Sequence, residues 1–412
     1  MTSRAMPVDR QRSDPDGNHR TWMETAEFYT AVLAVFFAPI NYLRLNVAYI
    51  TLSDAFLVLC LVFATLNGRV PLRPLGKATN LWYGSLLLFS AGLMMSSILV
   101  GDPGTGAIVT SQYVFAYALV PLCILGRSDR DITILIVTFV ASMVFVTIHG
   151  AYHVNFTDGP SPFVSGNGRL RSLVERTNET AALIAFAIVL ALWLYLANRL
   201  AGVLVAISIA ILGYGLVLTG SNTGFLLTCA GMVLLAVLSA SVRFSLTLIF
   251  VGTLVVVAVM LWGESFLPKV FVDRVLVALQ SGDPLQAGTF AGRLLLMQEA
   301  LGIADDSIVL GLGADQYRHV SIYSAPVHNL YLLVLAEGGL FALVGFTGLI
   351  FSLVYLGWSR LNDPRARLGG AITLTITAMF AACLTGIPHC YARFWVVPVI
   401  LAASASLASV SG

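Results

Sequence analysis

Twelve apolar segments of roughly membrane-spanning length constrain this chain more than any other feature of its sequence. A helix needs about 20 residues to cross a bilayer. Only 11% of the 412 residues are charged, whereas soluble domains carry about a quarter. Backbone groups within lipid must be paired inside the protein, which favours helices. The chain is therefore expected to be an all-α integral membrane protein. The twelve predicted helices cover residues 26–43, 47–66, 81–99, 108–126, 131–149, 180–198, 200–218, 223–240, 245–262, 329–357, 368–387 and 391–408.

Basic residues in the short connections indicate how these helices are oriented, because Lys and Arg are enriched in cytoplasmic loops. A cytoplasmic amino terminus leaves only Arg44 and Arg393 in the short outer connections. An even number of helices then places both termini in the cytoplasm. The basic residues expected on the cytoplasmic side are Arg69, Arg73, Lys77, Arg127, Arg130, Arg199, Arg243, Arg360, Arg365 and Arg367.

The predicted organisation has a tail, two helical blocks and two outer loops. Residues 1–25 form a cytoplasmic polar tail, 26–262 carry the first nine helices, and 329–412 carry the last three. The polar windows 150–179 and 263–328 face outward. The formal net charge of +2 is too small to indicate nucleic-acid binding. The five scattered cysteines show neither a disulfide framework nor metal-ligand spacing.

Window 263–328 is predicted to be one large loop that contains short amphipathic helices. Residues 290–303 have the periodicity of a helix that can lie at a membrane surface. Arg293 lies off the centre of its apolar stripe. The residues assigned to that stripe are Phe290, Leu294, Met297 and Leu301.

His328 closes this window and follows Pro326, at the start of the longest apolar segment. A helix N-terminus carries about half a positive charge, which disfavours imidazolium and keeps the ring neutral near pH 7. A neutral imidazole can act as a general base. The alternative is a histidine that only caps the helix or lies at the membrane interface.

Window 150–179 contains three arginines, Arg169, Arg171 and Arg176. They are exceptions to the enrichment of basic residues on the cytoplasmic side. Guanidinium groups bind phosphate oxygens through two parallel hydrogen bonds, so an anionic substrate at the outer surface is one interpretation. Contact with lipid headgroups, or pairing with Glu175, is the other. The outer turn at 387–393 is interpreted as an interfacial anchor.

Four short motifs follow one another between residues 290 and 355. They are Gly292-Arg293, Gly311-Leu312-Gly313, His328-Asn329-Leu330-Tyr331-Leu332 and Ala336-Glu337-Gly338-Gly339-Leu340-Phe341. Together they resemble the signature of the O-antigen ligase and O-antigen polymerase superfamily. These are bacterial multi-spanning glycosyltransferases with a large outer loop between late helices.

The resemblance implies transfer of a glycan from an undecaprenyl pyrophosphate carrier to an acceptor sugar hydroxyl. The reaction would take place at the periplasmic face of the inner membrane, without a metal ion, nucleotide or other cofactor. His328 would activate the acceptor hydroxyl, and Arg293 would bind the pyrophosphate and stabilise its growing charge. Asn329 would support the site from the helix start. Direct displacement would invert the anomeric centre. The expected partners are the lipid-linked donor, a glycan or lipid A core acceptor, and membrane lipids.

The chain departs from the family pattern at the outer turn before the eighth predicted helix. Family members often place an arginine after the serine of this turn, and here Asn222 follows Ser221. Asn222 is therefore expected at the substrate without supplying a charge. Arg176, or another arginine of the 169–176 cluster, is the candidate to replace the missing cation.

Three hypotheses remain open from the sequence. A ligase transfers the glycan to a lipid A core sugar, whereas a polymerase joins lipid-linked repeat units, and no sequence feature identifies the acceptor. A transporter or flippase of lipid-linked glycans would carry ionisable residues along a path at the membrane midplane. Here only Asp54 and Glu337 are expected to lie deep.

Overall fold

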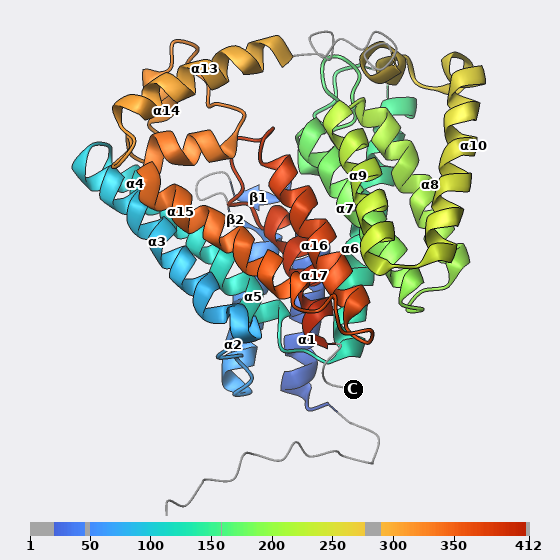
Figure 1. Ribbon diagram of the computed structural model, residues 1–412, viewed down its shortest axis with the longest axis horizontal. Coiled ribbons are helices and arrows are strands. Elements are labelled where there is room, and N and C mark those ends of the chain that lie inside the picture. Colours follow the sequence, from blue (N-terminus) through green and yellow to red (C-terminus); the bar gives the residue numbers. More distant parts are fainter. Residues whose placement is uncertain (1–19, 46–49, 158, 277–289, 409–412) are drawn as a thin grey trace, which may run out of the picture.

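The computed structural model describes residues 20–45, 50–157, 159–276 and 290–408. Figure 1 shows these residues as a set of packed helices with one small hairpin, in which β1 (Arg44–Leu45) pairs antiparallel with β2 (Ile50–Thr51). The prediction of an all-α architecture is confirmed. Most of the predicted tail at 1–25 lies outside the described residues.

The helices before residue 157 are α1 (Trp22–Phe37), α2 (Leu52–Leu66), η1 (Gly76–Ala78), α3 (Thr79–Leu99), α4 (Pro103–Val114), η2 (Phe115–Leu119), α5 (Val120–Ile124) and α6 (Asp129–Phe156). After it come η3 (Ser172–Val174), α7 (Thr177–Leu196), α8 (Gly202–Thr219), α9 (Asn222–Ser239), α10 (Val242–Phe266), α11 (Lys269–Phe271), η4 (Val272–Leu276), α13 (Phe290–Asp306), α14 (Tyr317–Val320), α15 (Leu330–Trp358), α16 (Arg367–Cys383) and α17 (Arg393–Ala408).

Each of the twelve predicted segments coincides with helix, but their lengths differ. Among the described residues, eight helical stretches are long and apolar enough to cross a membrane. They are Gly76–Leu99, Pro103–Ile124, Asp129–Phe156, Thr177–Leu196, Gly202–Thr219, Asn222–Ser239, Val242–Val259 and Leu330–Trp358. The other four helices, α1, α2, α16 and α17, have 15 to 17 residues. The chain therefore has the helices of a multi-pass membrane protein, and the total of twelve spans stays a prediction.

Capping residues fix where several helices begin. Asp102 caps α4, since its carboxylate accepts the backbone N–H groups of Gly104 and Thr105, with Pro103 at the first helical position. The fourth helix thus starts five residues earlier than its predicted start at 108. Asp54 belongs to the capping box of Thr51 at the start of α2 and pairs with Arg393 at the start of α17. Asp54 therefore lies at a helix start and is paired, while its depth in the membrane stays a prediction.

The core is built around α7 and around the contact between α3 and α15. α7 is buried along 83% of its apolar window, which makes it the central helix of the bundle. α15 packs along α3, and glycines bring their backbones together. A side chain at Gly345 would collide with the backbone of Phe89, and one at Gly92 would lie 2.5 Å from the backbone nitrogen of Ala342. Small residues at such positions allow the close helix packing that is typical inside membranes.

One end of the molecule, called the loop end below, carries α13, α14 and the segment 159–176. Figure 1 shows it opposite the start of α1 and the end of α17. At the loop end α15 is interrupted at Gly339, whose φ of 68° favours glycine. A Cβ there would collide with the carbonyl oxygen of Val309. The loop is held against α15 by three backbone hydrogen bonds, Leu312 N–H to Ala336 O, Gly313 N–H to Glu337 O and Leu340 N–H to Ile308 O.

Glu337 lies beside this interruption and is buried. Its carboxylate accepts the backbone N–H of Tyr317 at 3.2 Å, and its carbonyl accepts the N–H of Gly313. Both contacts hold the loop in place, so Glu337 has a structural role here.

The helix predicted at 290–303 is present as α13, and only part of its predicted apolar stripe packs against the rest of the protein. Leu294 and Leu301 are 43% and 55% exposed, whereas Ala300 and Ala304 are buried. α13 packs against α15, and alanines are favoured there because they permit close approach. Met297 does contact the core. Arg293, four residues before Met297 and seven before Ala300, therefore shares the face that turns inward.

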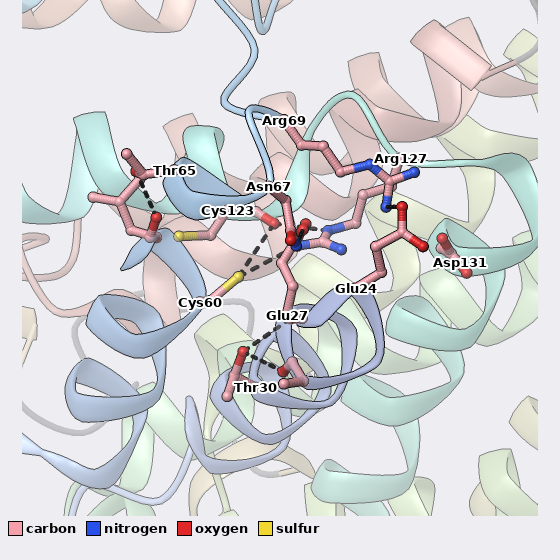
Figure 2. Close-up of polar contacts among 12 residues, drawn as sticks. Glu24, Glu27, Thr30, Cys60, Thr65, Asn67, Arg69, Cys123, Arg127 and Asp131 are labelled. Atoms are coloured by element: carbon pink, nitrogen blue, oxygen red, sulfur yellow. Dashed lines mark hydrogen bonds and ion pairs between the residues drawn. The ribbon is translucent and has the colours of Figure 1, made fainter. Parts of the chain in front are cut away.

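At the end opposite the loops, a buried ion pair joins α1 to the turn before α6. Figure 2 shows Glu27 of α1 facing Arg127, with 3.2 Å between the Arg127 Nη2 and Glu27 Oε1 atoms. Both side chains are at most 9% exposed. Asn67 donates to the other oxygen of Glu27 at 2.8 Å, and Arg127 Nε donates to the carbonyl of Cys123. The cluster ties together the ends of α1, α2 and α5.

Removing Arg127 is expected to destabilise the protein, because it leaves Glu27 buried without its counter-charge. Breaking a buried pair in this way costs about 3–5 kcal/mol. Thermal unfolding of the detergent-solubilised Arg127→Ala protein should therefore begin at a clearly lower temperature than that of the wild type. Arg130→Ala is the matched control, since Arg130 is exposed three residues away. Equal midpoints for both variants would contradict the assigned role of the pair.

Candidate functional site

A cavity of about 340 Å³ at the loop end collects side chains from four distant parts of the chain. They come from the segment that leads into the start of α7, from α13, from His328 just before α15, and from the turn between α16 and α17. We call it the arginine cavity. Its walls are formed by Arg169, Arg171, Glu175, Arg176, Thr177, Asn178, Glu179, Arg293, His328, Gly386, Ile387 and Pro388.

The neighbours of His328 in the chain fix its position just before the start of α15. Val327 is fully buried. Asn329 is the N-cap of α15, and its side chain accepts the backbone N–H of Leu332 at 3.3 Å. The N–H of Leu330 donates to the carbonyl of Leu384 at 2.9 Å, which fixes the helix start against the end of α16. The imidazole therefore projects into the cavity from a rigid base.

The electrostatic surroundings favour a neutral ring at His328. Burial lowers its pKa below the usual value, and the nearby charges of Arg293 and Arg176 lower it further. The sequence argument attributed a neutral ring to the helix N-terminus. The structure also indicates a lowered pKa for His328, and it adds desolvation and two guanidinium groups as causes. The ring can thus accept a proton near neutral pH.

Arg293 points from α13 toward the turn between α16 and α17. Its Nη1 atom would lie 3.8 Å from a Cβ placed on Gly386. Its Nε is buried and has no hydrogen-bond partner among the described residues. Burial and the charge of Arg274 lower its pKa. A buried hydrogen-bond donor without a partner costs free energy, so this guanidinium is suited to bind an anionic ligand.

Arg169 links the cavity to the turn between α8 and α9. Its Nε donates to the carbonyl of Thr219 at 2.6 Å, and its Nη2 donates to Asn178 at 3.0 Å. Burial, together with Arg274, Arg293 and Arg171, lowers its pKa to about 10. The sequence placed this residue in a cluster of three without distinguishing it, because no local pattern reveals a contact across 50 residues.

Positive charge predominates in the arginine cavity. Four arginines and two glutamates form its walls, which leaves two positive charges in excess (4 − 2). Glu179 pairs with Arg176 at 3.3 Å, and Glu175 already pairs with Arg44 outside the cavity. Like charges repel unless a ligand compensates them. The arrangement can bind a phosphate or pyrophosphate beside a neutral base.

The five predicted site residues are therefore not all in one place. His328, Arg293 and Arg176 all line the arginine cavity. Asn329 does not line it and acts as the helix cap. Asn222 also lies outside its walls, although its buried Oδ1 has no hydrogen-bond partner among the described residues.

The turn of Asn222 is nevertheless attached to the cavity. Ser221, the N-cap of α9, donates its hydroxyl to Asn178 at 3.2 Å. Asn178 also accepts from Arg169. Arg169 therefore brings a guanidinium to the turn where this chain has Asn222 in place of an arginine, while Arg176 lies nearer to His328.

The turn at 387–393 is predicted to be an interfacial anchor, and in the structure it lines two cavities. Ile387 and Pro388 form a wall of the arginine cavity, and His389 lines a larger cavity next to it. Arg393 of this turn pairs with Asp54. The sequence could not indicate this ion pair, because 339 residues separate the two side chains.

Among the described residues, no group of three or more His, Cys, Asp or Glu side chains could hold a metal ion.

Comparison with known proteins gives one family match. Residues 207–347 match the family model described as O-antigen ligase, which confirms the resemblance to the O-antigen ligase and polymerase superfamily. This stretch contains Arg293 and His328, whereas Arg176 precedes it. No curated protein matches the chain. The match supports a function of the O-antigen ligase or polymerase type.

Proposed function

We propose that this protein transfers a glycan from an undecaprenyl pyrophosphate carrier to a sugar hydroxyl at the periplasmic face of the inner membrane. One observation carries the proposal: His328, Arg293 and Arg176 line a single cavity with excess positive charge. A base and two guanidinium groups are the components that displacement of a pyrophosphate requires.

In the proposed step, the hydroxyl oxygen of the acceptor attacks the anomeric carbon of the donor sugar. Its proton passes to His328. The bond between the anomeric carbon and the phosphate oxygen breaks, and its electron pair stays on the leaving pyrophosphate. Arg293 and Arg176 stabilise this charge, so that no metal ion or nucleotide is required. The carrier leaves as undecaprenyl pyrophosphate, and direct attack inverts the anomeric centre.

Ligase and polymerase activities both fit this chemistry, because they share the donor and differ in the acceptor. Loss of the protein from its own host separates them. Long glycans left on the carrier identify a ligase that uses a lipid A core, whereas single repeat units identify a polymerase. A glycan profile identical to that of the wild type would overturn the proposed function.

The lowered pKa of His328 predicts how activity depends on pH. The neutral ring is the active base, so kcat/KM should stay high as the pH falls through the usual titration range of histidine and decline only below it. Arg176→Gln removes one of the charges that lower this pKa. The acid limb of the profile of this variant should therefore move to higher pH. A profile with the acid limb of the wild type would argue against His328 as the titrating group.

A further inference from the structure

Two histidines near the end of α6 form a pair that the proposed transfer reaction does not use. His149 and His153 are four residues apart, so they lie on the same face of the helix. Their ring centroids are 4.7 Å apart, and the ring planes are inclined at 54°, so the rings are not stacked. Neither histidine lines the arginine cavity. The pair therefore needs an explanation of its own.

The hydrogen bonds of Ser172 determine which nitrogen of His149 carries a hydrogen. Ser172 Oγ donates its only hydrogen to the carbonyl of Val146 at 2.6 Å. Toward His149 Nδ1, at 3.2 Å, the same oxygen can therefore only accept. Nδ1 thus carries the hydrogen of the neutral ring, and the lone pair lies on Nε2. Histidines that bind metal ions typically have this arrangement, in which Nδ1–H donates to a protein oxygen and orients the ring.

His153 is oriented by similar contacts. Its Nδ1 lies 3.2 Å from the hydroxyl oxygen of Thr157. Among the described residues, neither His149 nor His153 uses its Nε2 atom in a hydrogen bond. Phe163 contacts both imidazoles, with centroid distances of 4.6 Å to His149 and 4.7 Å to His153. The two rings are therefore fixed by the protein, and both Nε2 atoms remain available to a ligand.

The separation of the two rings fits one metal ion bound between them. With Zn–N distances of about 2.0–2.1 Å and tetrahedral geometry, two imidazoles on one ion have centroids roughly 5 Å apart. The centroids of His149 and His153 are 4.7 Å apart. Histidines at positions i and i+4 of a helix can bind zinc from one face, and imidazole is a suitable ligand for Zn²⁺, Cu²⁺ and Ni²⁺.

We propose that His149 and His153 form a binding site for a divalent transition-metal ion, with Nε2 of each ring as a ligand. The described residues supply no third His, Cys, Asp or Glu to this site, so water molecules complete the coordination. The ion has no part in the glycan transfer, and the inference does not depend on the proposed function. Ser172 joins the site to the segment that carries Arg171 of the arginine cavity.

Calorimetric titration with ZnCl₂ tests the site on the full chain, purified in detergent without a polyhistidine tag and freed of metal by a chelator. The wild type should bind one Zn²⁺ per chain. His153→Ala should lose this binding at the same zinc concentrations, because only one imidazole remains. His319→Ala, at an exposed position on α14, is the matched control and should bind zinc as the wild type does.

Ser172→Ala is the second variant, because it keeps both ligands and removes the oxygen that orients His149. It should weaken zinc binding by about 10- to 100-fold. Zinc should also raise the thermal unfolding midpoint of the wild type and not that of His153→Ala, since an ion that binds only the folded state stabilises it.

Cu²⁺ gives a spectroscopic test of the ligands. Its electron paramagnetic resonance spectrum should show coupling to two imidazole nitrogens in the wild type and lose this pattern in His153→Ala. Equal zinc affinity in the wild type and His153→Ala would mean an adventitious ion bound elsewhere and would overturn the site. Absence of zinc binding by the wild type would overturn it as well.

Discussion

Cells whose only copy carries His328→Ala are expected to lose glycan transfer while the protein still inserts into the membrane. Removing a positioned general base lowers the rate by about 10²- to 10⁴-fold. The fold should survive, because Val327, the Asn329 cap and the bond from Leu330 to Leu384 hold the helix start without the imidazole. The measurement compares lipid-linked intermediates with finished polysaccharide in the variant and the wild type.

His319→Ala is the matched control for this change. His319 lies at the same end of the molecule, on α14, and its side chain is exposed. Cells with this variant should keep the wild-type glycan profile. If His328→Ala also kept that profile at normal expression, the proposed base would be wrong and the histidine would have at most a structural role.

Arg293→Lys is expected to have the second-largest effect, although it keeps the positive charge. An ammonium group cannot replace the two parallel hydrogen bonds of a guanidinium. Loss of one well-placed donor to a developing negative charge costs about 10²- to 10³-fold in kcat. Since that charge grows as the glycosidic bond breaks, kcat should fall more than the affinity for the donor.

Release of undecaprenyl pyrophosphate by the purified protein measures this effect directly. Arg365→Lys, at an exposed site between α15 and α16, should leave the rate unchanged. An Arg293→Lys protein with wild-type turnover would show that Arg293 only supports the packing of α13 against the bundle.

Local sequence was sufficient to predict the helices and part of the candidate site. Each predicted apolar run coincides with a helix. Backbone groups within lipid must be paired inside the protein, and a helix achieves this within one segment. Position at a helix start also marked His328 as a candidate base. These features depend on neighbours within a few residues, and that is why they can be read from one sequence.

Long-range packing was the part that the sequence did not reveal. The stripe assigned to α13 favoured large side chains, whereas Ala300 and Ala304 form the buried contact, so Arg293 turned out to face inward. Likewise, Arg169 reaches Thr219 across 50 residues. The buried face of α13 and the contact of Arg169 both depend on which segments become neighbours in the fold. Small residues and single arginines give no periodic pattern from which such neighbours can be predicted.

The backbone hydrogen bonds between the loop after α13 and the interrupted start of α15 have a consequence for protein engineering. They pair residues 308–313 with 336–340, on either side of His328. Arg293 and His328 therefore belong to one interlocked unit, and neither can be grafted alone into another scaffold with its geometry intact. The smallest exchangeable block in a chimera of related proteins should run from residue 290 to 345, together with the surface of α3 on which it rests.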